Sequence, residues 1–479
     1  MEKIAIIGMG SSGMAVLAAY AKEVDKERVT IDCYDTEESF GRGYPYRDDS
    51  HDLILNLKTR KISYDYQNND DLANWLKEKG KEEPVYTSRA TFGEYTRDRL
   101  DESMSKIGAQ KITEKIVRMD KVGKQWELET EKGSINRYDR VHLCNGEIPQ
   151  RSIYNKVETH PNYIQDIYPI REKLAHIKEK DRVCVIGAGL TGVDVTTHLI
   201  TEKNIKKVAM FSRTNLIPTV RVEPVMLEMK VFTMEALNGI LEENYGRITF
   251  EQFDELFNKE LEVHDIDFER FVQKHMQGGI EELKTNIREP DELARVQALL
   301  PIMNVIFNKV WDSMPKSDRI KFRRKYHPFM TLNRSPLPLE SARILIDASE
   351  KGILTMPTQI EDIIICSDKF RLKKSDGNID DAVGEFDYII NATGLDTSME
   401  KVEEKNELLA QLMDKRYVLV DEYGGFAVVP ETMASISSRY GTLENLHIHG
   451  VLASGVQYRN NSTLIMQMTA HRLIKEQYC

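Results

Sequence analysis

The chain opens with the stretch Lys3-Ile4-Ala5-Ile6-Ile7-Gly8-Met9-Gly10-Ser11-Ser12-Gly13, from which its fold can be predicted. Its apolar start predicts a buried strand, its Gly-x-Gly-x-x-Gly spacing predicts a tight turn, and residues 14–21 predict a helix. In such a turn the glycines permit the bend, the approach of a pyrophosphate to the backbone, and close packing of helix on strand. Phosphates then lie at the helix N-terminus. The sequence therefore predicts dinucleotide contacts from Gly8, Gly10, Ser11, Ser12 and Gly13.

An acidic residue stands where a ribose contact is expected. The next predicted strand, residues 29–35, ends in Asp35, which follows Gly13 by 22 residues. A carboxylate at this place can accept a hydrogen bond from a ribose hydroxyl. Strand, turn, helix and acid together predict a dinucleotide site, with Asp35 as the ribose contact.

The same pattern recurs in the middle of the chain. A strand at residues 183–186 leads into Gly187-Ala188-Gly189-Leu190-Thr191-Gly192 and a helix, and the next strand, residues 207–213, ends in Ser212 and Arg213. A guanidinium at this place suits a 2′-phosphate, whereas an acid would repel it. The pattern favours NADPH over NADH; the alternative is that Arg213 only ends the strand. The predicted contacts are Gly187, Gly189, Leu190, Thr191, Gly192, Ser212 and Arg213.

Each fingerprint is followed by a second strand that ends in glycine, at Gly146 and at Gly394 of Ala392-Thr393-Gly394. This order predicts an α/β protein with two Rossmann-like domains, an FAD-binding domain interrupted by an NADPH-binding domain. We expect the FAD-binding domain at residues 1–165 and 395–479 and the NADPH-binding domain at residues 166–394. Residues 220–345 carry apolar side chains at helical spacing and predict a mainly helical insertion.

The composition of the chain limits the classes of partner that it is expected to bind. The formal charge of −11 and pI of about 5.6 oppose binding to nucleic acid or anionic membranes. No apolar run is long enough to span a bilayer, so we expect a cytoplasmic protein. We also expect a small-molecule substrate, and a homodimer is compatible with the sequence. The five cysteines form no Cys-x-x-Cys pair, which opposes a disulfide reductase, and no metal site is expected. The basic run at residues 319–328 is a solvated helix face or a contact for NADPH phosphates or an anionic substrate.

Several blocks together resemble the bacterial FAD/NAD(P)-binding protein family. They are residues 8–13, 41–46, 51–56, 88–95 and 189–194, with Ser212-Arg213. The family is related to the flavin-containing and N-hydroxylating monooxygenases, which share two fingerprints and an interrupted FAD domain. The resemblance implies that Arg42 meets the FAD pyrophosphate and that Asn56 lies near the flavin.

The C-terminal block departs from related flavoenzymes. Where these usually carry a Gly-Asp that holds the ribityl chain, residues 446–455 contain no aspartate. Gly450 and the turn Asn460-Asn461-Ser462-Thr463 are still expected to aim a helix N-terminus at the flavin N1–O2 edge. The predicted contacts here are Gly450, Ser462 and Thr463.

The two cofactors imply an FAD-dependent, NADPH-consuming oxidoreductase. The first hypothesis is a monooxygenase that works through a flavin C4a-peroxide on a small polar, amino-acid-like amine. It needs no general base, and no catalytic side chain is assigned because the sequence shows no Ser-His-Asp or paired-carboxylate signature. The Baeyer–Villiger fingerprint is absent, which favours N-hydroxylation or another reaction that the sequence does not identify. The alternatives are a flavin reductase or dehydrogenase that passes electrons to a small acceptor or partner protein, and a non-catalytic redox sensor.

Overall fold

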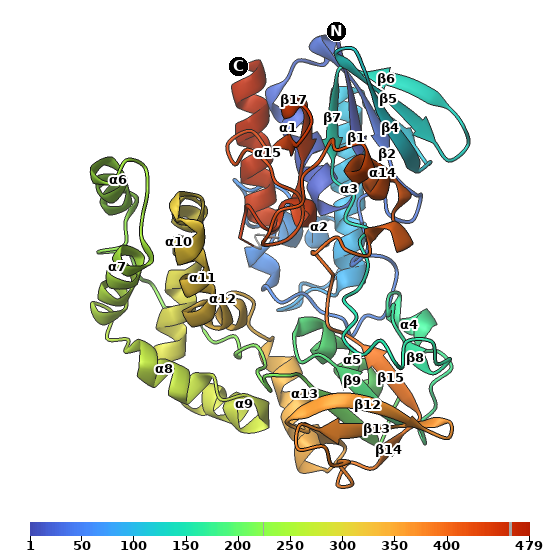
Figure 1. The fold of residues 1–479 in the computed structure, drawn as a ribbon, viewed down its shortest axis with the longest axis vertical. Coiled ribbons are helices and arrows are strands. Elements are labelled where there is room, and N and C mark those ends of the chain that lie inside the picture. The colour runs from blue at the N-terminus through green and yellow to red at the C-terminus, as the bar shows by residue number, and fades with distance from the viewer. Residues whose placement is uncertain (224, 459–461) are drawn as a thin grey trace. The chain divides into compact units, whose positions relative to one another are not determined.

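The structure is a computed structural model that describes residues 1–223, 225–458 and 462–479 (Figure 1). The chain divides into two compact units: unit 1 comprises Met1–Pro149 and Leu395–Cys479, and unit 2 comprises Gln150–Gly394. Residues 150–165, which we expected in the FAD-binding domain, lie in unit 2. The reason is that β8 (Tyr163–Ile164) extends the sheet of unit 2 by pairing with β15 (Tyr388–Asn391).

Unit 1 is built on a six-stranded sheet in the order β16-β17-β7-β1-β2-β3. Its strands are β1 (Glu2–Ile7), β2 (Val29–Tyr34), β3 (Gln110–Ile112), β7 (Arg140–Leu143), β16 (Ala434–Ser437) and β17 (Gly441–Ile448). All neighbours pair in parallel except β16, which runs antiparallel to β17. Residues 4–7 of β1 are buried, as expected for a central strand covered on both faces.

Helices from distant parts of the sequence meet in unit 1. Helix α1 (Ser11–Glu23) packs against α3 (Arg89–Ile107) and against the C-terminal α15 (Thr463–Tyr478). An antiparallel sheet of β4 (Ile116–Val122), β5 (Gln125–Thr130) and β6 (Ile135–Tyr138) lies beside β1 and β7. The smaller elements are η1 (Lys26–Arg28), η2 (Thr59–Lys61), α2 (Asp71–Glu78), η3 (Val402–Glu404), α14 (Glu407–Asp414) and η4 (Gly450–Ala453).

Unit 2 repeats the central motif of unit 1. Its parallel sheet has the order β11-β10-β9-β15-β8, with β9 (Arg182–Ile186), β10 (Lys207–Phe211) and β11 (Leu354–Thr355), and α5 (Leu190–Thr201) follows β9. A second sheet is formed by β12 (Ile360–Cys366), β13 (Lys369–Lys374) and β14 (Glu385–Phe386), and α4 spans Ile170–Lys173. The two Rossmann-like folds expected from the sequence are thus confirmed.

The insertion within unit 2 is helical, as predicted. Its helices, drawn from green to orange in Figure 1, are α6 (Met234–Glu243), α7 (Phe250–Glu262), α8 (Phe268–His275), α9 (Gly279–Arg288), α10 (Asp291–Ser313), α11 (Lys316–Lys325), α12 (His327–Arg334) and α13 (Leu339–Glu350). Aromatic rings form its core: Phe253 lies edge-on to both Phe322 and Tyr326, with centroids 5.2 and 5.5 Å away. No helix within residues 1–223, 225–458 and 462–479 has both the length and the apolar composition of a membrane span.

Several basic side chains of the run at residues 319–328 make contacts within the helical insertion. Arg319 Nε donates to the carbonyl oxygens of Trp311 and Met314, each at 2.9 Å, at the end of α10. Lys321 pairs with Glu251 at 2.7 Å, and Lys325 pairs with Asp254 at 2.6 Å. These contacts favour the structural interpretation of the run over a phosphate contact.

A buried carboxylate fixes the entry into the insertion. Glu260 of α7 is fully buried and accepts hydrogen bonds from the backbone N–H groups of Lys230, Val231 and Phe232. It also contacts His264 Nε2 at 2.8 Å. Burial raises the pKa of Glu260, but these hydrogen bonds outweigh it and hold the pKa below its usual range.

Glu260→Gln is therefore expected to destabilise the protein by about 2 kcal/mol, because an amide NH₂ would face backbone donors. The stabilisation from Glu260 is present above its unfolded pKa of about 4.3 and is lost as the pH falls through the lower folded pKa. Urea unfolding at several pH values measures both effects. The matched control is Glu255→Gln, since among the described residues Glu255 makes only an exposed pair, with Lys259 on the same helix. Equal losses in the two variants would contradict the role of Glu260.

Candidate dinucleotide-binding sites

The glycine turn of unit 1 is required by close backbone approaches. Gly8 has φ of 90°, and a methyl group on it would lie 2.8 Å from the Cα atom of Asn145 at the end of β7. A methyl group on Gly13 would lie 2.0 Å from the carbonyl oxygen of Gly8. A side chain on Gly13 would push α1 away from β1, and a side chain on Gly8 would collide with the end of β7. The two glycines thus keep the helix N-terminus at the carboxyl edge of the sheet.

The turn of unit 2 has the same geometry. Gly187 has φ of 109°, and a methyl group on it would lie 2.5 Å from the carbonyl oxygen of Ala392 at the end of β15. A methyl group on Gly192 would lie 1.9 Å from the carbonyl oxygen of Gly187. Gly189 differs, because no atom of the described residues lies within 4 Å of the position of its missing methyl group. That space is where a ligand could approach the backbone.

Both helices that follow the turns begin without a side-chain cap. The N-cap residues are Gly10 for α1 and Gly189 for α5, and neither helix has an acidic residue in its first turn. The first N–H groups of a helix lack partners within the helix and attract anions. Ser11, Ser12, Leu190 and Thr191 supply first-turn positions of these helices. The two N-termini thus fit the phosphates of two dinucleotides.

A cavity of about 200 Å³ opens beside the turn of unit 1. Gly8, Asp35 and Asn145 line it together with the segment 115–117 and the segment 405–408. The Asp35 carboxylate accepts hydrogen bonds from the backbone N–H groups of Met9 at 2.6 Å and of Thr36 at 2.7 Å. Burial raises its pKa above the usual range despite these bonds. The size of the cavity and the carboxylate on its wall fit a nucleoside.

The cavity-lining residues of β4 and α14 could not be predicted from the sequence. Ile116 and Val117 begin β4, and Asn406 caps α14, far from either fingerprint. Lys115 Nζ pairs with Glu147 at 3.0 Å, and both residues line the cavity. No motif marks these residues, because they meet the site only through the packing of the β4–β6 sheet and of α14.

The end of β10 presents a positive charge. Ser212 and Arg213 follow β10 directly, and Ser212 Oγ donates to the carbonyl oxygen of Leu216 at 3.4 Å. Arg213 is exposed, and it forms no hydrogen bond or ion pair with another described residue. Its guanidinium is therefore available to a phosphate ligand.

The loop that carries Arg42 lies against the glycine turn. A methyl group on Gly10 would lie 3.1 Å from the Cα atom of Gly43. The Arg42 side chain lines a surface hollow of about 240 Å³ with Trp75, Arg97 and neighbouring charged residues. Its contact with a pyrophosphate stays a prediction. The same holds for Asn56, which is half-buried in a segment that pairs through Leu55 N with the carbonyl oxygen of Thr87 at 2.9 Å.

The C-terminal segment reaches the same turn. Gly450 has φ of 68°, and a methyl group on it would lie 2.2 Å from Ser12 Oγ. Ser12 Oγ also donates to Met466 Sδ of α15 at 3.4 Å. Ser462 is the N-cap of α15 and Thr463 its first residue, whereas Asn460 and Asn461 lie outside the described residues.

The other two predicted glycines lie at strand exits. Gly146 follows β7, and its missing methyl group would make an ordinary 3.6 Å contact with Val451. Gly394 has φ of 85°, and its carbonyl oxygen accepts from Arg151 N at 2.8 Å.

The histidines of the unit 1 sheet form a buried cluster. His142 Nδ1 lies 3.0 Å from His449 Nε2, and its Nε2 lies 2.9 Å from the Tyr20 hydroxyl. Arg140 donates to His447 Nε2 at 2.8 Å. Burial lowers the pKa of His447 to about 4 and that of His449 to about 3. Across the described residues, no group of three or more His, Cys, Asp or Glu side chains is arranged to hold a metal ion.

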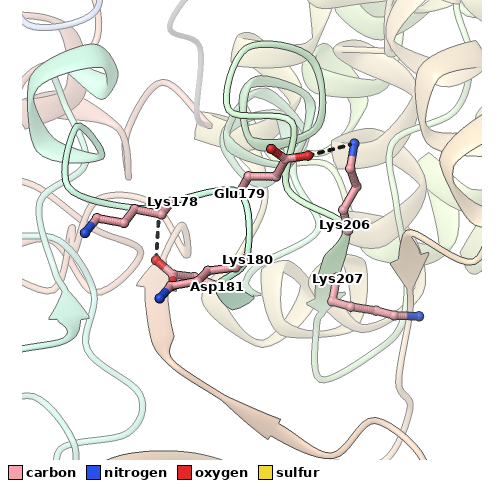
Figure 2. A pocket seen from close by; sticks show the side chains of 6 residues that line it. All are labelled: Lys178, Glu179, Lys180, Asp181, Lys206 and Lys207. Atoms are coloured by element: carbon pink, nitrogen blue, oxygen red, sulfur yellow. Dashed lines mark hydrogen bonds and ion pairs between the residues drawn. The ribbon is translucent and has the colours of Figure 1, made fainter.

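A larger surface hollow lies elsewhere. Figure 2 shows its lining, Lys178, Glu179, Lys180, Asp181, Lys206 and Lys207, around a volume of about 370 Å³. These residues precede β9 and begin β10, whereas Gly187 follows the other end of β9. Cofactors bind at the carboxyl ends of parallel strands, so this hollow is no part of the dinucleotide site.

Comparisons with known proteins agree with this geometry. Residues 5–148 match a family described as FAD-NAD(P)-binding. The sequence matches no curated protein.

Solved structures share the whole fold. An ornithine N-hydroxylase from Kutzneria sp. 744, with reduced FAD, NADP⁺ and L-ornithine, has a TM-score of 0.57 at 11% identity and covers 100% of both chains. The cadaverine monooxygenase DfoA from Erwinia amylovora, bound to FAD, has 0.59 at 11% and covers 99% of this chain and 93% of its own. L-lysine 6-monooxygenase from Pseudomonas syringae has 0.59 at 12% and covers 99% of both. The chain therefore shares the fold of these three enzymes.

Gly450→Ala is expected to lower stability by about 3 kcal/mol, because the methyl group both strains the backbone and displaces Ser12. Gly441→Ala is the matched control on the same segment: its φ is 73°, but no described atom lies within 4 Å of the added methyl group. This control should lose only about 1–2 kcal/mol. Urea unfolding measures both variants, and equal losses would contradict a close approach between Gly450 and Ser12.

Proposed function

We propose that the protein is an FAD-dependent, NADPH-consuming oxidoreductase, with FAD in unit 1 and NADPH in unit 2. The observation that carries the proposal is the repeated turn with opposite charges at the ribose position. Asp35 follows β2 in unit 1, and Arg213 follows β10 in unit 2. A carboxylate suits an unsubstituted ribose, whereas a guanidinium suits a 2′-phosphate.

We further propose that the reaction is a monooxygenation of a small polar amine. The likeness of fold to enzymes that act on ornithine, lysine and cadaverine supports this substrate class. Bound FAD would supply the redox chemistry, taking a hydride from NADPH and passing electrons to oxygen. No side chain of the chain is assigned as a general base in this reaction.

The chain's own residues would bind and orient the cofactors. The first turns of α1 and α5 would hold the two pyrophosphates, and Asp35 would accept a hydrogen bond from a ribose hydroxyl. Arg213 would select NADPH by charge-assisted hydrogen bonds to the 2′-phosphate. The N-terminus of α15, which begins at Thr463, would favour negative charge on the reduced flavin.

Arg213→Ala is expected to raise the KM for NADPH about 10- to 100-fold and to leave the KM for NADH nearly unchanged, because only NADPH carries the 2′-phosphate. Steady-state NAD(P)H oxidation measures both constants. Arg288→Ala serves as the control, because Arg288 is an exposed arginine of unit 2 paired with Glu289. An equal effect of Arg213→Ala on NADH and NADPH would contradict the 2′-phosphate contact.

The monooxygenase proposal is tested by product analysis under ¹⁸O₂ with NADPH and a panel of lysine, ornithine, cadaverine and other small amines. We expect one ¹⁸O atom in a hydroxylamine product for at least one amine, with product formed in step with NADPH consumed. NADPH oxidation that proceeds with an artificial electron acceptor but yields no oxygenated amine would instead indicate a reductase. Absence of any turnover would favour a redox sensor.

A further inference from the structure

Two buried polar atoms near the glycine turn of unit 1 have no hydrogen-bond partner within the described residues. They are the hydroxyl oxygen of Tyr64 and Oε1 of Gln467. Tyr64 is 7% exposed and Gln467 is 0% exposed. Leaving a buried polar group unpaired costs about 1–3 kcal/mol, so each such group needs an explanation, and a bound ligand is one.

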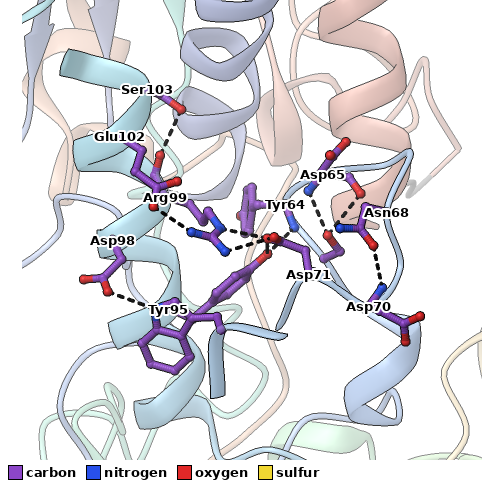
Figure 3. A network of polar contacts seen from close by, with 12 residues as sticks. Tyr64, Asp65, Asn68, Asp70, Asp71, Tyr95, Asp98, Arg99, Glu102 and Ser103 are labelled. Carbon is purple, nitrogen blue, oxygen red and sulfur yellow. Dashed lines mark hydrogen bonds and ion pairs between the residues drawn. The ribbon is translucent and has the colours of Figure 1, made fainter. Parts of the chain in front are cut away.

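A polar network fixes the backbone that carries Tyr64 (Figure 3). The Tyr95 hydroxyl accepts a hydrogen bond from Tyr64 N at 2.8 Å and donates to Asp71 Oδ2 at 2.5 Å. Arg99 holds Asp71 with two hydrogen bonds, from Nε at 2.8 Å and from Nη2 at 2.9 Å. In this network of Tyr95, Asp71 and Arg99, the side chains satisfy one another's hydrogen bonds. The network therefore holds the Tyr64 backbone in place without using the Tyr64 hydroxyl.

The Tyr64 ring points its hydroxyl toward the glycine turn. The hydroxyl lies beside the Ser11 side chain, the first residue of α1, without the geometry of a hydrogen bond. The ring packs against Phe92, with centroids 6.0 Å apart. Burial raises the pKa of Tyr64 far above its usual range, so the hydroxyl keeps its proton and can donate it.

Gln467 brings a matching acceptor to the same region. Its Nε2 donates to the carbonyl oxygen of Ser63 at 2.8 Å and to that of Thr463 at 3.2 Å. Only the amide NH₂ can donate to two carbonyl oxygens, so these contacts fix the orientation of the amide and leave Oε1 as the unpaired atom. The neighbouring Met466 contacts Ser12, which places this part of α15 beside the turn.

We propose that Tyr64 and Gln467 hold the ribityl-phosphate part of FAD, with the Tyr64 hydroxyl donating to an oxygen of that part and Gln467 Oε1 accepting from a ribityl hydroxyl. The inference rests on the proposed binding of FAD in unit 1. A pyrophosphate offers acceptors only and would leave Oε1 unpaired, whereas a polyol phosphate offers both acceptors and donors. Gln467 thereby supplies the acceptor for which residues 446–455 contain no aspartate.

Tyr64→Phe tests the donor. The apoprotein variant is expected to unfold at the same urea concentration as the wild type, because the hydroxyl has no partner in the described chain. Its Kd for FAD, measured by quenching of flavin fluorescence, is expected to rise about tenfold. Tyr95→Phe is the matched control: its hydroxyl is fully paired, so the apoprotein itself should lose stability.

Equal FAD affinity of Tyr64→Phe and wild type would overturn the role of Tyr64. Failure of the wild-type apoprotein to bind FAD would overturn the proposed function, and this inference with it. The two failures are distinguishable because the first requires that the wild type binds.

FAD analogues that each lack one ribityl hydroxyl test the acceptor. For one analogue, wild-type affinity should fall about tenfold, while Gln467→Met should bind that analogue and FAD with equal affinity. This coupling isolates the contact from any change in folding caused by the substitution. If every analogue loses the same factor in both proteins, Gln467 does not accept from the ribityl chain.

Discussion

The structure depends on one steric constraint that occurs twice. The third glycine of each turn lies so close to the carbonyl oxygen of the first that a methyl group would approach it within 2.0 Å at Gly13 and 1.9 Å at Gly192. This approach brings a helix N-terminus to the carboxyl edge of each parallel sheet. Because both N-termini begin without side-chain caps, each edge attracts an anion. The proposed positions of the two pyrophosphates follow from this placement.

The two turns differ in what surrounds them. In unit 1, the turn is enclosed by the loop that carries Arg42 and Gly43, by Gly450 and by α15. In unit 2, no described atom fills the space beside Gly189. A tightly enclosed turn suits a resident cofactor, and an open one suits a cofactor that comes and goes. This contrast is consistent with FAD in unit 1 and NADPH in unit 2, and the charges of Asp35 and Arg213 favour the same assignment.

The sequence predicted what depends on local pattern. Both glycine turns, their strands and the helical insertion could be found because spacing and periodicity along the chain encode them. Val117, Tyr64 and Gln467 could not, because they reach the site through long-range packing of β4, of the 63–65 segment and of α15. The boundary at residue 165 was also misjudged. The strand β8, which pairs with β15, is too short to produce a periodic pattern in the sequence. Its pairing places residues 150–165 in unit 2.

We propose that one chain binds FAD and accepts electrons from NADPH. Anaerobic stopped-flow mixing of the purified protein with NADPH or NADH, followed at the flavin absorbance, tests it most directly. We expect a yellow protein with one FAD per chain that NADPH reduces faster than NADH does. A protein that neither contains nor binds FAD, or a bound flavin that neither nucleotide reduces, would contradict it.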